Sequence, residues 1–390
     1  MDIDFARPYF GDEERKAVNG VMAGYWLANG EQVAAFEKEF AAYIGVPYAL
    51  ACNSGSSANL LALASLGLEK GAKVLTSGCG FPATLNPILH LGLDPILVDY
   101  ETETCNISLV DVLQEIPNVK AVLLAHTMGN PVAMHSIMSA AYDYGVPVIE
   151  DCCEAIGARF NGFKVGAIGS MGTFSFYPSH QITALGGGGM VTFKNEQHYL
   201  RAKSLREWGK TPMRDTYGRR NTTYSGRIDN LDYFPHYIYE TVGWNFQLPE
   251  ANAAFGREQL KRMKWLIAER QKNHDAIVAS LPDGEFEPVE VHKHADPCWF
   301  GVILKPKNVK RNEFGDALER RGIRHRPFFA GNITRHDPYV AYSTPLPNAD
   351  WLMERALFIG CYAGMTDEQV SYVCDGIKLA LEDCKQLIEA

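Results

Sequence analysis

A carboxylate, a hydroxyl and an imidazole follow one another near the middle of the chain. Asp151 ends the apolar run 146–149, and Ser175 and His180 lie in the segment 174–183. Histidine exchanges protons near neutral pH, and a carboxylate at the carboxyl end of a parallel strand faces the usual ligand crevice. The pattern indicates a ligand site in which His180 moves protons. Taken alone, Asp151 would be better explained as a residue that caps the next loop.

A second polar segment, 53–59, has the sequence Asn-Ser-Gly-Ser-Ser-Ala-Asn and lies between a strand-like and a helix-like stretch. Gly55 permits a tight turn, and a helix N-terminus offers free N–H groups and partial positive charge. Ser56 and Ser57 add hydroxyl donors, so the segment suits a phosphate. Taken by itself, it also fits an ordinary capped helix start.

These groups need a sheet to bring them together. Short apolar runs alternate with helical patterns over the first 200 residues, which predicts a mostly parallel sheet with crossover helices. The expected strands are 48–51, 73–76, 95–99, 121–125, 146–150, 172–176 and 189–193. The expected helices between them are 56–66, 84–91, 134–144 and 196–208. The glycine run 186–189 is either a flexible loop or a place of close backbone approach.

The rest of the chain predicts a connector and a smaller unit. Residues 209–244 form a polar and aromatic excursion, a type of loop that is often functional or interface-forming. A single long helix is expected from Pro249 to about Leu281, followed by a strand at 299–304 and helices at 311–321 and 367–387. The predicted domains are therefore 1–250 (large α/β domain), 251–284 (connecting helix) and 285–390 (small α+β domain).

Composition excludes several classes of protein. The 390 residues are 46% hydrophobic, enough for a substantial core. A formal net charge of −9 argues against nucleic acid as the main partner. No stretch reaches the roughly 20 apolar residues of a membrane span, and the acidic N-terminus lacks a signal-peptide layout. A cytoplasmic location is expected. The nine cysteines match neither a zinc site nor a disulfide framework, so no metal is expected.

The chain order of phosphate turn, acidic strand end, serine and base resembles fold-type I pyridoxal phosphate enzymes. The chain is most similar to the sugar aminotransferase superfamily, and within it to the dehydratase branch typified by GDP-4-keto-6-deoxy-D-mannose 3-dehydratase. The segments that carry the likeness are 24–30, 53–59, 125–131, 177–180, 206–209, 243–245, 299–301 and 330–335. The resemblance implies a large domain with a mixed, mostly parallel sheet and a smaller α+β domain.

The resemblance also implies roles for single residues. Phe81 would stack on the cofactor ring, Asp151 would pair with its pyridine nitrogen, and Glu154 would lie near the ring oxygen or the substrate. Gly55, Ser56 and Ser175 would hold the phosphate, joined by Asn245 from the neighbouring subunit, which implies a homodimer with shared active sites. From sequence alone, Phe81 and Asn245 could also be an ordinary core aromatic and a loop residue.

Binding of a nucleotide sugar is expected from residues elsewhere in the chain. The candidates are Trp26, Arg324, Arg326, Asn332 and Arg335. A planar guanidinium suits the oxygens of a diphosphate. Arg219, Arg220 and His325 belong to the same basic set, although a solvated charged surface is an equally good interpretation of Arg219 and Arg220.

His180 stands where an aminotransferase of this superfamily carries a lysine, which binds the cofactor aldehyde covalently. Histidine cannot form that stable bond, so pyridoxal or pyridoxamine phosphate would be held non-covalently. The resemblance implies 3-dehydration of a nucleotide-linked 4-keto-6-deoxyhexose, in which His180 takes a proton from the cofactor's C4′ carbon and returns it to the departing C3 hydroxyl. L-Glutamate would then restore the cofactor amine. The alternatives are a sugar aminotransferase, natural or with its lysine replaced, and a catalytically silent binding protein.

Two departures from the family's pattern matter. Some of these dehydratases hold a cysteine-ligated [2Fe–2S] cluster just after the segment equivalent to 206–209, yet no cysteine occurs here between Cys153 and Cys298. A cluster-free enzyme, of the kind that acts on a GDP-linked sugar, is therefore expected. Gln181 and Gly186 replace a histidine and a glutamate that are common in relatives, which leaves the exact substrate open.

Overall fold

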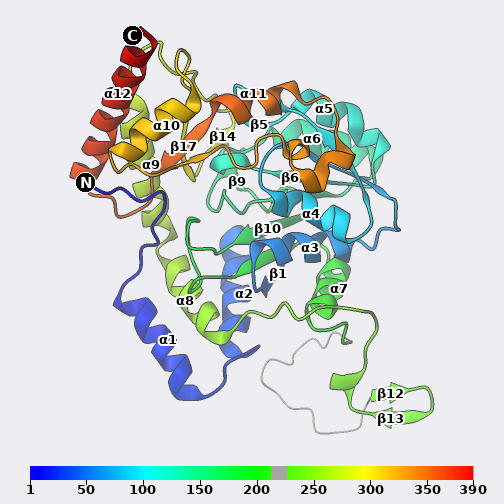
Figure 1. The fold of residues 1–390 in the computed structure, drawn as a ribbon. Helices are drawn as coiled ribbons and strands as arrows, with labels where there is room; N and C mark the ends of the chain where they lie inside the picture. Colours follow the sequence, from blue (N-terminus) through cyan, green and yellow to red (C-terminus); the bar gives the residue numbers. More distant parts are fainter. Residues whose placement is uncertain (212–225, 390) are drawn as a thin grey trace.

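A computed structural model describes residues 1–211 and 226–389. Its centre is a seven-stranded sheet in the order β1-β11-β10-β7-β6-β2-β3 (Figure 1). The bounds of these strands are β1 Tyr48–Cys52, β2 Lys73–Ser77, β3 Asp94–Val98, β6 Ala121–Ala125, β7 Val148–Asp151, β10 Met171–Ser175 and β11 Gly189–Phe193. Within this sheet β11 alone runs antiparallel to its neighbours. The mixed, mostly parallel sheet of the fold-type I class is confirmed.

Helices cover both faces of the sheet, as its largely buried strands require. Successive side chains of a strand point to opposite faces. Leu123 of β6 accordingly packs with α3 (Gly55–Ser65), α4 (Pro82–His90) and α7 (Glu196–Arg206). Its neighbours Val122 and Leu124 pack with α5 (Leu109–Glu115) and α6 (Met134–Tyr144) on the other face. The expected strands and crossover helices are all present, with ends that differ by two residues or fewer.

The single helix expected from Pro249 to Leu281 is wrong. The structure has two helices, α8 (Glu250–Lys261) and α9 (Met263–Ala279), joined at Arg262. The side chain of Arg262 turns back to the buried Glu14, with Nε 3.0 Å from Oε1. The break lets α8 pack against α1 (Asp12–Gly24) and α2 (Glu31–Ile44), while α9 contacts the C-terminal helix α12 (Asp367–Glu389). Neither proline nor glycine marks this break in the sequence.

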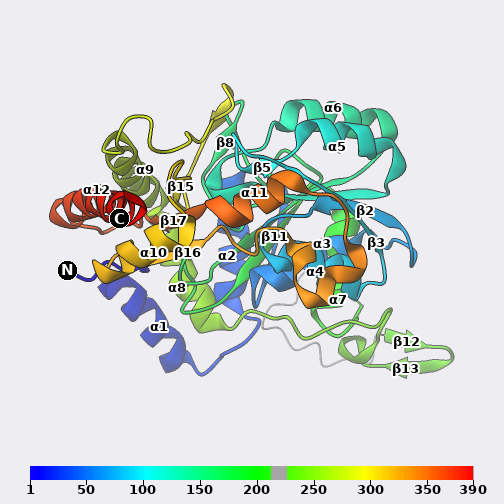
Figure 2. The same ribbon diagram turned by 45° about the horizontal axis from the view of Figure 1, so that its top comes forward.

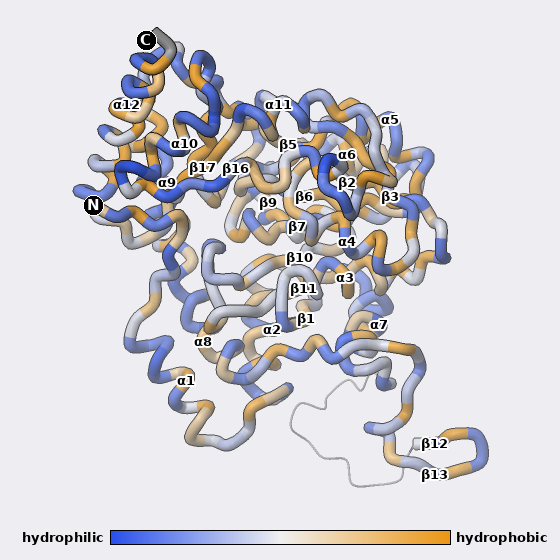
Figure 3. The backbone as a smooth tube through the Cα atoms, in the orientation of Figure 1, coloured by the Kyte–Doolittle hydropathy of each residue, from blue (hydrophilic) through white to orange (hydrophobic). Residues whose placement is uncertain are grey.

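A second, antiparallel sheet forms the core of the C-terminal part. It has the order β15-β17-β16, with bounds Gly301–Leu304, Leu357–Gly360 and His325–Pro327. Helices α10 (Arg311–Arg320) and α12 pack on it. In Figure 3 the tube through α12 alternates between hydrophilic and hydrophobic, as expected of a helix with one face on a sheet. The short helix α11 (Pro347–Arg355) contacts β4 (Tyr100–Glu101), which follows β3 of the large sheet in the chain.

The N-terminal residues join the same C-terminal unit. The N–H of Ile3 donates to Gly322, and the carbonyl of Ile3 accepts from Arg324. Figure 1 accordingly shows the N-terminus beside α12. Sequence grouped these residues with the large domain, and the domain boundaries themselves remain a prediction.

The excursion after α7 carries a small hairpin. Strands β12 (Gly226–Ile228) and β13 (Leu231–Tyr233) project away from the main body in both views (Figures 1 and 2). Leu231 is 68% exposed. Arg219 and Arg220 lie outside the described residues. Across the described ranges, no helix is both long and apolar enough to cross a membrane.

Candidate active site

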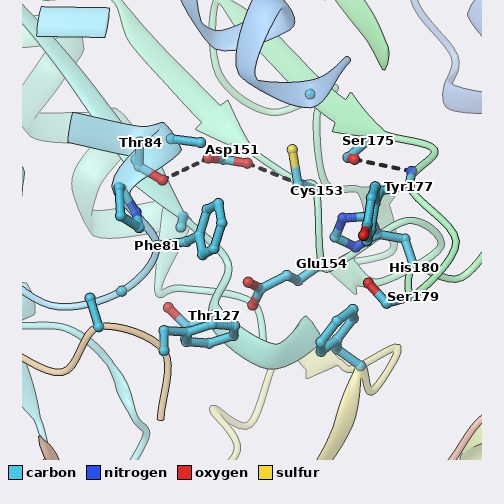
Figure 4. A pocket seen from close by; sticks show the side chains of 18 of the residues that line it. Phe81, Thr84, Thr127, Asp151, Cys153, Glu154, Ser175, Tyr177, Ser179 and His180 are labelled. Atoms are coloured by element: carbon cyan, nitrogen blue, oxygen red, sulfur yellow. Dashed lines mark hydrogen bonds between the residues drawn. The ribbon is translucent and has the colours of Figure 1, made fainter. Parts of the chain in front are cut away.

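A cavity of about 650 Å³ opens at the carboxyl ends of the parallel strands. Its wall includes Ala125, Asp151 and Ser175, the last residues of β6, β7 and β10. Of the residues proposed from sequence, those that line it are Gly55, Ser56, Phe81, Asp151, Glu154, Ser175, His180 and Arg326. Figure 4 shows several of them facing one space. Residues far apart in sequence thus meet where parallel-sheet topology places a ligand.

The phosphate turn is the N-terminus of α3. Ser54 caps the helix: its Oγ accepts the N–H of Ser57 at 3.1 Å, and its carbonyl accepts that of Ala58. The next two residues, Gly55 and Ser56, line the cavity. Helix-start N–H groups carry partial positive charge, so this edge of the cavity suits an anion.

Glycine at two positions allows the turn to sit where it does. A Cβ on Gly55 would lie 2.7 Å from Cβ of Ser175 and 2.9 Å from Sγ of Cys153. A Cβ on Gly189 would lie 2.3 Å from the carbonyl oxygen of Ser54. The glycine run 186–189 was expected to be either a flexible loop or a place of close backbone approach. At Gly189 the structure shows a close approach, because the absence of a side chain lets β11 lie against the turn.

Asp151 is buried, and three donors hold its carboxylate. Oδ2 accepts from Nδ2 of Asn59 and from Oγ1 of Thr84, both at 2.8 Å, and Oδ1 accepts the N–H of Cys153 at 3.1 Å. Figure 4 shows the hydrogen bonds from Thr84 and Cys153. Thr173 in turn donates to Oδ1 of Asn59. The carboxylate therefore has a fixed orientation at the cavity wall. Sequence reasoning missed Asn59 and Thr84. The one available signal was that Asn59 lies four residues after Gly55, on the same face of α3.

His180 lies in the loop between β10 and β11, with its ring 5.3 Å from that of Phe300. Among the described residues, its buried Nδ1 has no hydrogen-bond partner. Burial and, to a smaller extent, the positive charge of Arg270 lower the pKa of His180 to about 3. The imidazole is therefore neutral at physiological pH, which is the protonation state that a general base needs. Sequence had suggested a pKa closer to the working pH.

Glu154 lines the same cavity, but its carboxyl group is protonated at physiological pH whereas the imidazole of His180 is not. Its Oε2 accepts the N–H of Met128 at 2.7 Å. Met128 adopts a left-handed conformation with φ 56°, which is unusual for a residue other than glycine. Burial raises the pKa of Glu154 to about 8; the Met128 N–H opposes this rise and the charge of Asp151 adds to it. A neutral base and a protonated acid thus share one cavity, an arrangement typical of proton-transfer sites.

Glu154→Gln should change how stability depends on pH. An acid whose pKa is about 8 in the folded protein, against an ordinary 4.5, destabilises the fold when it ionises. Wild-type stability should then decline as pH rises from about 4.5 through about 8, and the variant should escape that part of the decline. We expect the variant's Tm relative to wild type to rise by a few degrees between about pH 5 and about pH 9. Parallel Tm curves in calorimetry would contradict the buried, protonated acid.

A cluster that includes His126 of the cavity wall has residue types that can bind a metal, but its polar groups already have hydrogen-bond partners. Among the described residues, the possible ligand atoms of His126, Glu150 and Cys152 lie within 4.8 Å of one another. His126 Nδ1 accepts the N–H of Val132, so Nε2 carries the proton and donates to Glu150 at 3.0 Å. The other carboxylate oxygen of Glu150 accepts N–H groups from the loop before β10. These hydrogen bonds account for the cluster without an ion.

The remaining predicted residues do not line the cavity. Arg324 pairs with Glu319 at 2.6 Å. Arg335 and the buried Asn332 both donate to Asp350. Trp26 is 48% exposed, and Asn245 is exposed beside Glu207. A role for any of them in binding a sugar or a cofactor stays a prediction.

Comparison with known proteins identifies relatives over nearly the whole chain. The model of the DegT/DnrJ/EryC1/StrS aminotransferase family matches residues 8–378. The lipopolysaccharide biosynthesis protein RfbH of Salmonella typhimurium is 37% identical, with 89% of this chain and 84% of that protein covered. A dTDP-4-dehydro-2,6-dideoxy-D-glucose 3-dehydratase of Saccharopolyspora spinosa is 34% identical, with 94% and 84% covered.

Solved structures agree with this result. Two structures of GDP-4-keto-6-deoxymannose-3-dehydratase are 26% identical with a TM-score of 0.87, and cover 96% of this chain and 100% of theirs. One is a mutant with bound GDP-perosamine, and the other contains a trapped PLP-glutamate geminal diamine. The resemblance stated from the sequence is confirmed, and pyridoxal phosphate is confirmed as a cofactor among the solved relatives. This chain belongs to the DegT/DnrJ/EryC1/StrS aminotransferase family.

Proposed function

We propose that the protein is a pyridoxal phosphate-dependent 3-dehydratase of a nucleotide-diphospho-4-keto-6-deoxyhexose. The observation that carries the proposal is the neutral imidazole of His180 at the cavity wall. The described residues that line this cavity include no lysine. Without a lysine, the cofactor has no residue there to bind it covalently. A base that cannot capture the cofactor favours loss of a hydroxyl over transfer of an amine.

The residues that line the cavity are of the types that could hold pyridoxamine phosphate. The α3 turn with Ser175 would hold the phosphate, and the oriented carboxylate of Asp151 would pair with the ring nitrogen. The ring of Phe81, 59% exposed at the wall, offers a flat apolar surface for the cofactor ring. When bound, the cofactor supplies an amine for the C4 ketone and a ring that accepts electrons.

Side chains of the protein would then carry out the proton transfers. His180 accepts a proton and returns it to the C3 hydroxyl oxygen of the sugar, which leaves as water. Glu154, protonated below a pKa of about 8, would donate a hydrogen bond to the bound cofactor or sugar. Phe300 and Phe358 exclude water from one side. The final product would be a 4-keto-3,6-dideoxy sugar, with release of ammonia.

The finer assignment rests on resemblance. We propose a GDP-linked sugar, glutamate as the amino donor and a role in dideoxysugar synthesis for lipopolysaccharide O-antigen. The cluster-free mechanism is supported by the absence of cysteine between Cys153 and Cys298. A homodimer would bring the exposed Asn245 to the partner's cofactor phosphate, and the projecting β12–β13 hairpin offers surface for such an interface. A cytoplasmic location remains part of this proposal.

Mass spectrometry of the products tests the reaction directly. The purified protein would be incubated with pyridoxal phosphate, glutamate and a panel of GDP-, dTDP- and CDP-linked 4-keto-6-deoxy sugars. We expect one nucleotide sugar to lose its C3 hydroxyl and keep a ketone at C4. A product with an amine at C4 would establish a sugar 4-aminotransferase instead. Tight binding with no change in any sugar would indicate a silent binding protein.

A further inference from the structure

Gln181, the residue after His180, is buried and spans two other segments of the chain. Its Nε2 donates to the backbone carbonyl of Glu154 and to that of Cys298, the latter at 3.1 Å. Both partners are acceptors only, so the NH₂ end of the amide must face them. One side chain therefore links the loop of the proposed base to the loop of the buried acid.

The same junction is tied by several further hydrogen bonds. The guanidinium of the buried Arg270 donates to the carbonyl of His180 at 3.0 Å and to that of Phe300 at 3.2 Å. The N–H groups of Cys298 and Phe300 donate to the carbonyls of Gly129 and Met128. Met128 is also the residue whose N–H holds the Glu154 carboxylate. These hydrogen bonds join the segment 298–300 to the loop that follows β6, at the wall of the cavity.

We propose that Gln181 is a positioning residue that keeps His180 and Glu154 at a fixed separation across the cavity. The inference rests on the proposed function, because it assigns Gln181 to the same proton-transfer site. Gln181 is adjacent to His180 in the chain, and its side-chain amide donates a hydrogen bond to the backbone carbonyl of Glu154. Displacing either loop would move one proton-transfer group relative to the other.

Few side chains at position 181 could make both of these hydrogen bonds. Two carbonyl acceptors need two N–H donors on one atom, which a primary amide provides. A neutral histidine has a single N–H, an ionised glutamate has none, and asparagine is shorter by one methylene. Glutamate nevertheless has nearly the same shape as glutamine, and it regains one O–H donor on protonation. Glutamate is therefore a pH-controlled probe of this contact.

Thr183 provides a matched control in the same loop. It is buried, and its Oγ1 donates to the carbonyl of Phe176 at 2.9 Å. Phe176 belongs to the same loop at its β10 end, so this hydrogen bond joins no separate segment. Thr183→Val removes a buried hydrogen bond from the loop but leaves the link between His180 and Glu154 intact.

The experiment compares Gln181→Leu, Gln181→Glu and Thr183→Val with wild type. A displacement of about 1 Å can cost about 100-fold in rate, so we expect Gln181→Leu to lower kcat by about 10- to 100-fold. KM for the sugar should stay within about threefold, because Gln181 itself does not line the cavity. Thr183→Val should keep kcat within about twofold. The rate of Gln181→Glu relative to wild type should rise as pH falls from about 8.5 to about 6.

A second readout needs neither cofactor nor turnover. Amide hydrogen exchange of the protein alone should be faster at Met128 and His180 in both Gln181 variants than in Thr183→Val. Wild-type kcat and exchange in Gln181→Leu would overturn the inference, as would an equal loss of kcat in Thr183→Val. The proposed function can fail separately. If wild type makes an amino sugar, the ratio of variant to wild-type rate still tests Gln181, whereas the product's mass decides the reaction.

Discussion

His180→Asn should lower turnover by about 10²- to 10⁴-fold, the contribution typical of a positioned acid–base group. Asparagine is close in size and polar, but it cannot accept and return a proton near neutral pH. Cofactor affinity should change little, because the α3 turn and Asp151 lie elsewhere on the wall. Single-turnover kinetics, with cofactor binding followed by fluorescence, measures both quantities. His135→Asn, on the exposed surface of α6, is the matched control.

His180→Lys extends the same argument. A lysine at this position could bind the cofactor aldehyde covalently, so we expect cofactor to remain attached after borohydride reduction and to appear in the intact mass. Part of the product should then carry an amine at C4. Covalent attachment of cofactor in the wild-type protein would contradict the proposed dehydratase. So would undiminished dehydration by His180→Asn.

Asp151→Asn is expected to have the second largest effect. The carboxylate holds two donors on Oδ2 and one on Oδ1, and an amide must turn its NH₂ toward one of them. The variant would lose the negative charge that keeps the cofactor's ring nitrogen protonated. Removing one preorganised electrostatic group typically costs about 10²- to 10³-fold in kcat, and weaker cofactor binding should add to the loss.

The readouts are kcat at saturating cofactor and cofactor affinity from titration. Thr84→Val is the informative companion, because it removes one of the two donors to Oδ2 and keeps the charge. It should reduce turnover far less than Asp151→Asn. Asp143→Asn, on the exposed end of α6, controls for loss of an acidic residue in general. Equal kcat in Asp151→Asn and Asp143→Asn would exclude Asp151 from the cofactor site.

The sheet was predictable because local signals determine it. Each of its strands is a short apolar run flanked by turns, and burial on both faces makes such runs continuous rather than alternating. The break at Arg262 was not predictable. No local helix breaker marks it, and the structure pairs Arg262 with Glu14, which lies far away in sequence. Long-range contacts of this kind override helix propensity.

The candidate site also has parts that were predictable from the sequence and parts that were not. The phosphate turn, Asp151 and His180 are recognisable from residue type and order, and the fold brings them to one cavity. The donors to Asp151 are invisible in the sequence, since Asn59 and Thr84 come from different helices. The protonation states of Glu154 and His180 also depend on burial, which sequence order does not report. Gln181 looked like a weakness of the family assignment until its two carbonyl partners were known.

The aromatic wall of the cavity joins the two ends of the polypeptide. Phe5 packs edge-on against Phe300 and Phe358, and all three line the cavity. During translation, the phosphate turn, Asp151 and His180 are therefore synthesised long before Phe358, the residue that completes this wall. Only a chain translated through β17 holds every residue of this wall, so a ligand enclosed by the wall would stabilise that chain more than shorter ones. Truncated translation products would then lack that protection and be exposed to proteolysis.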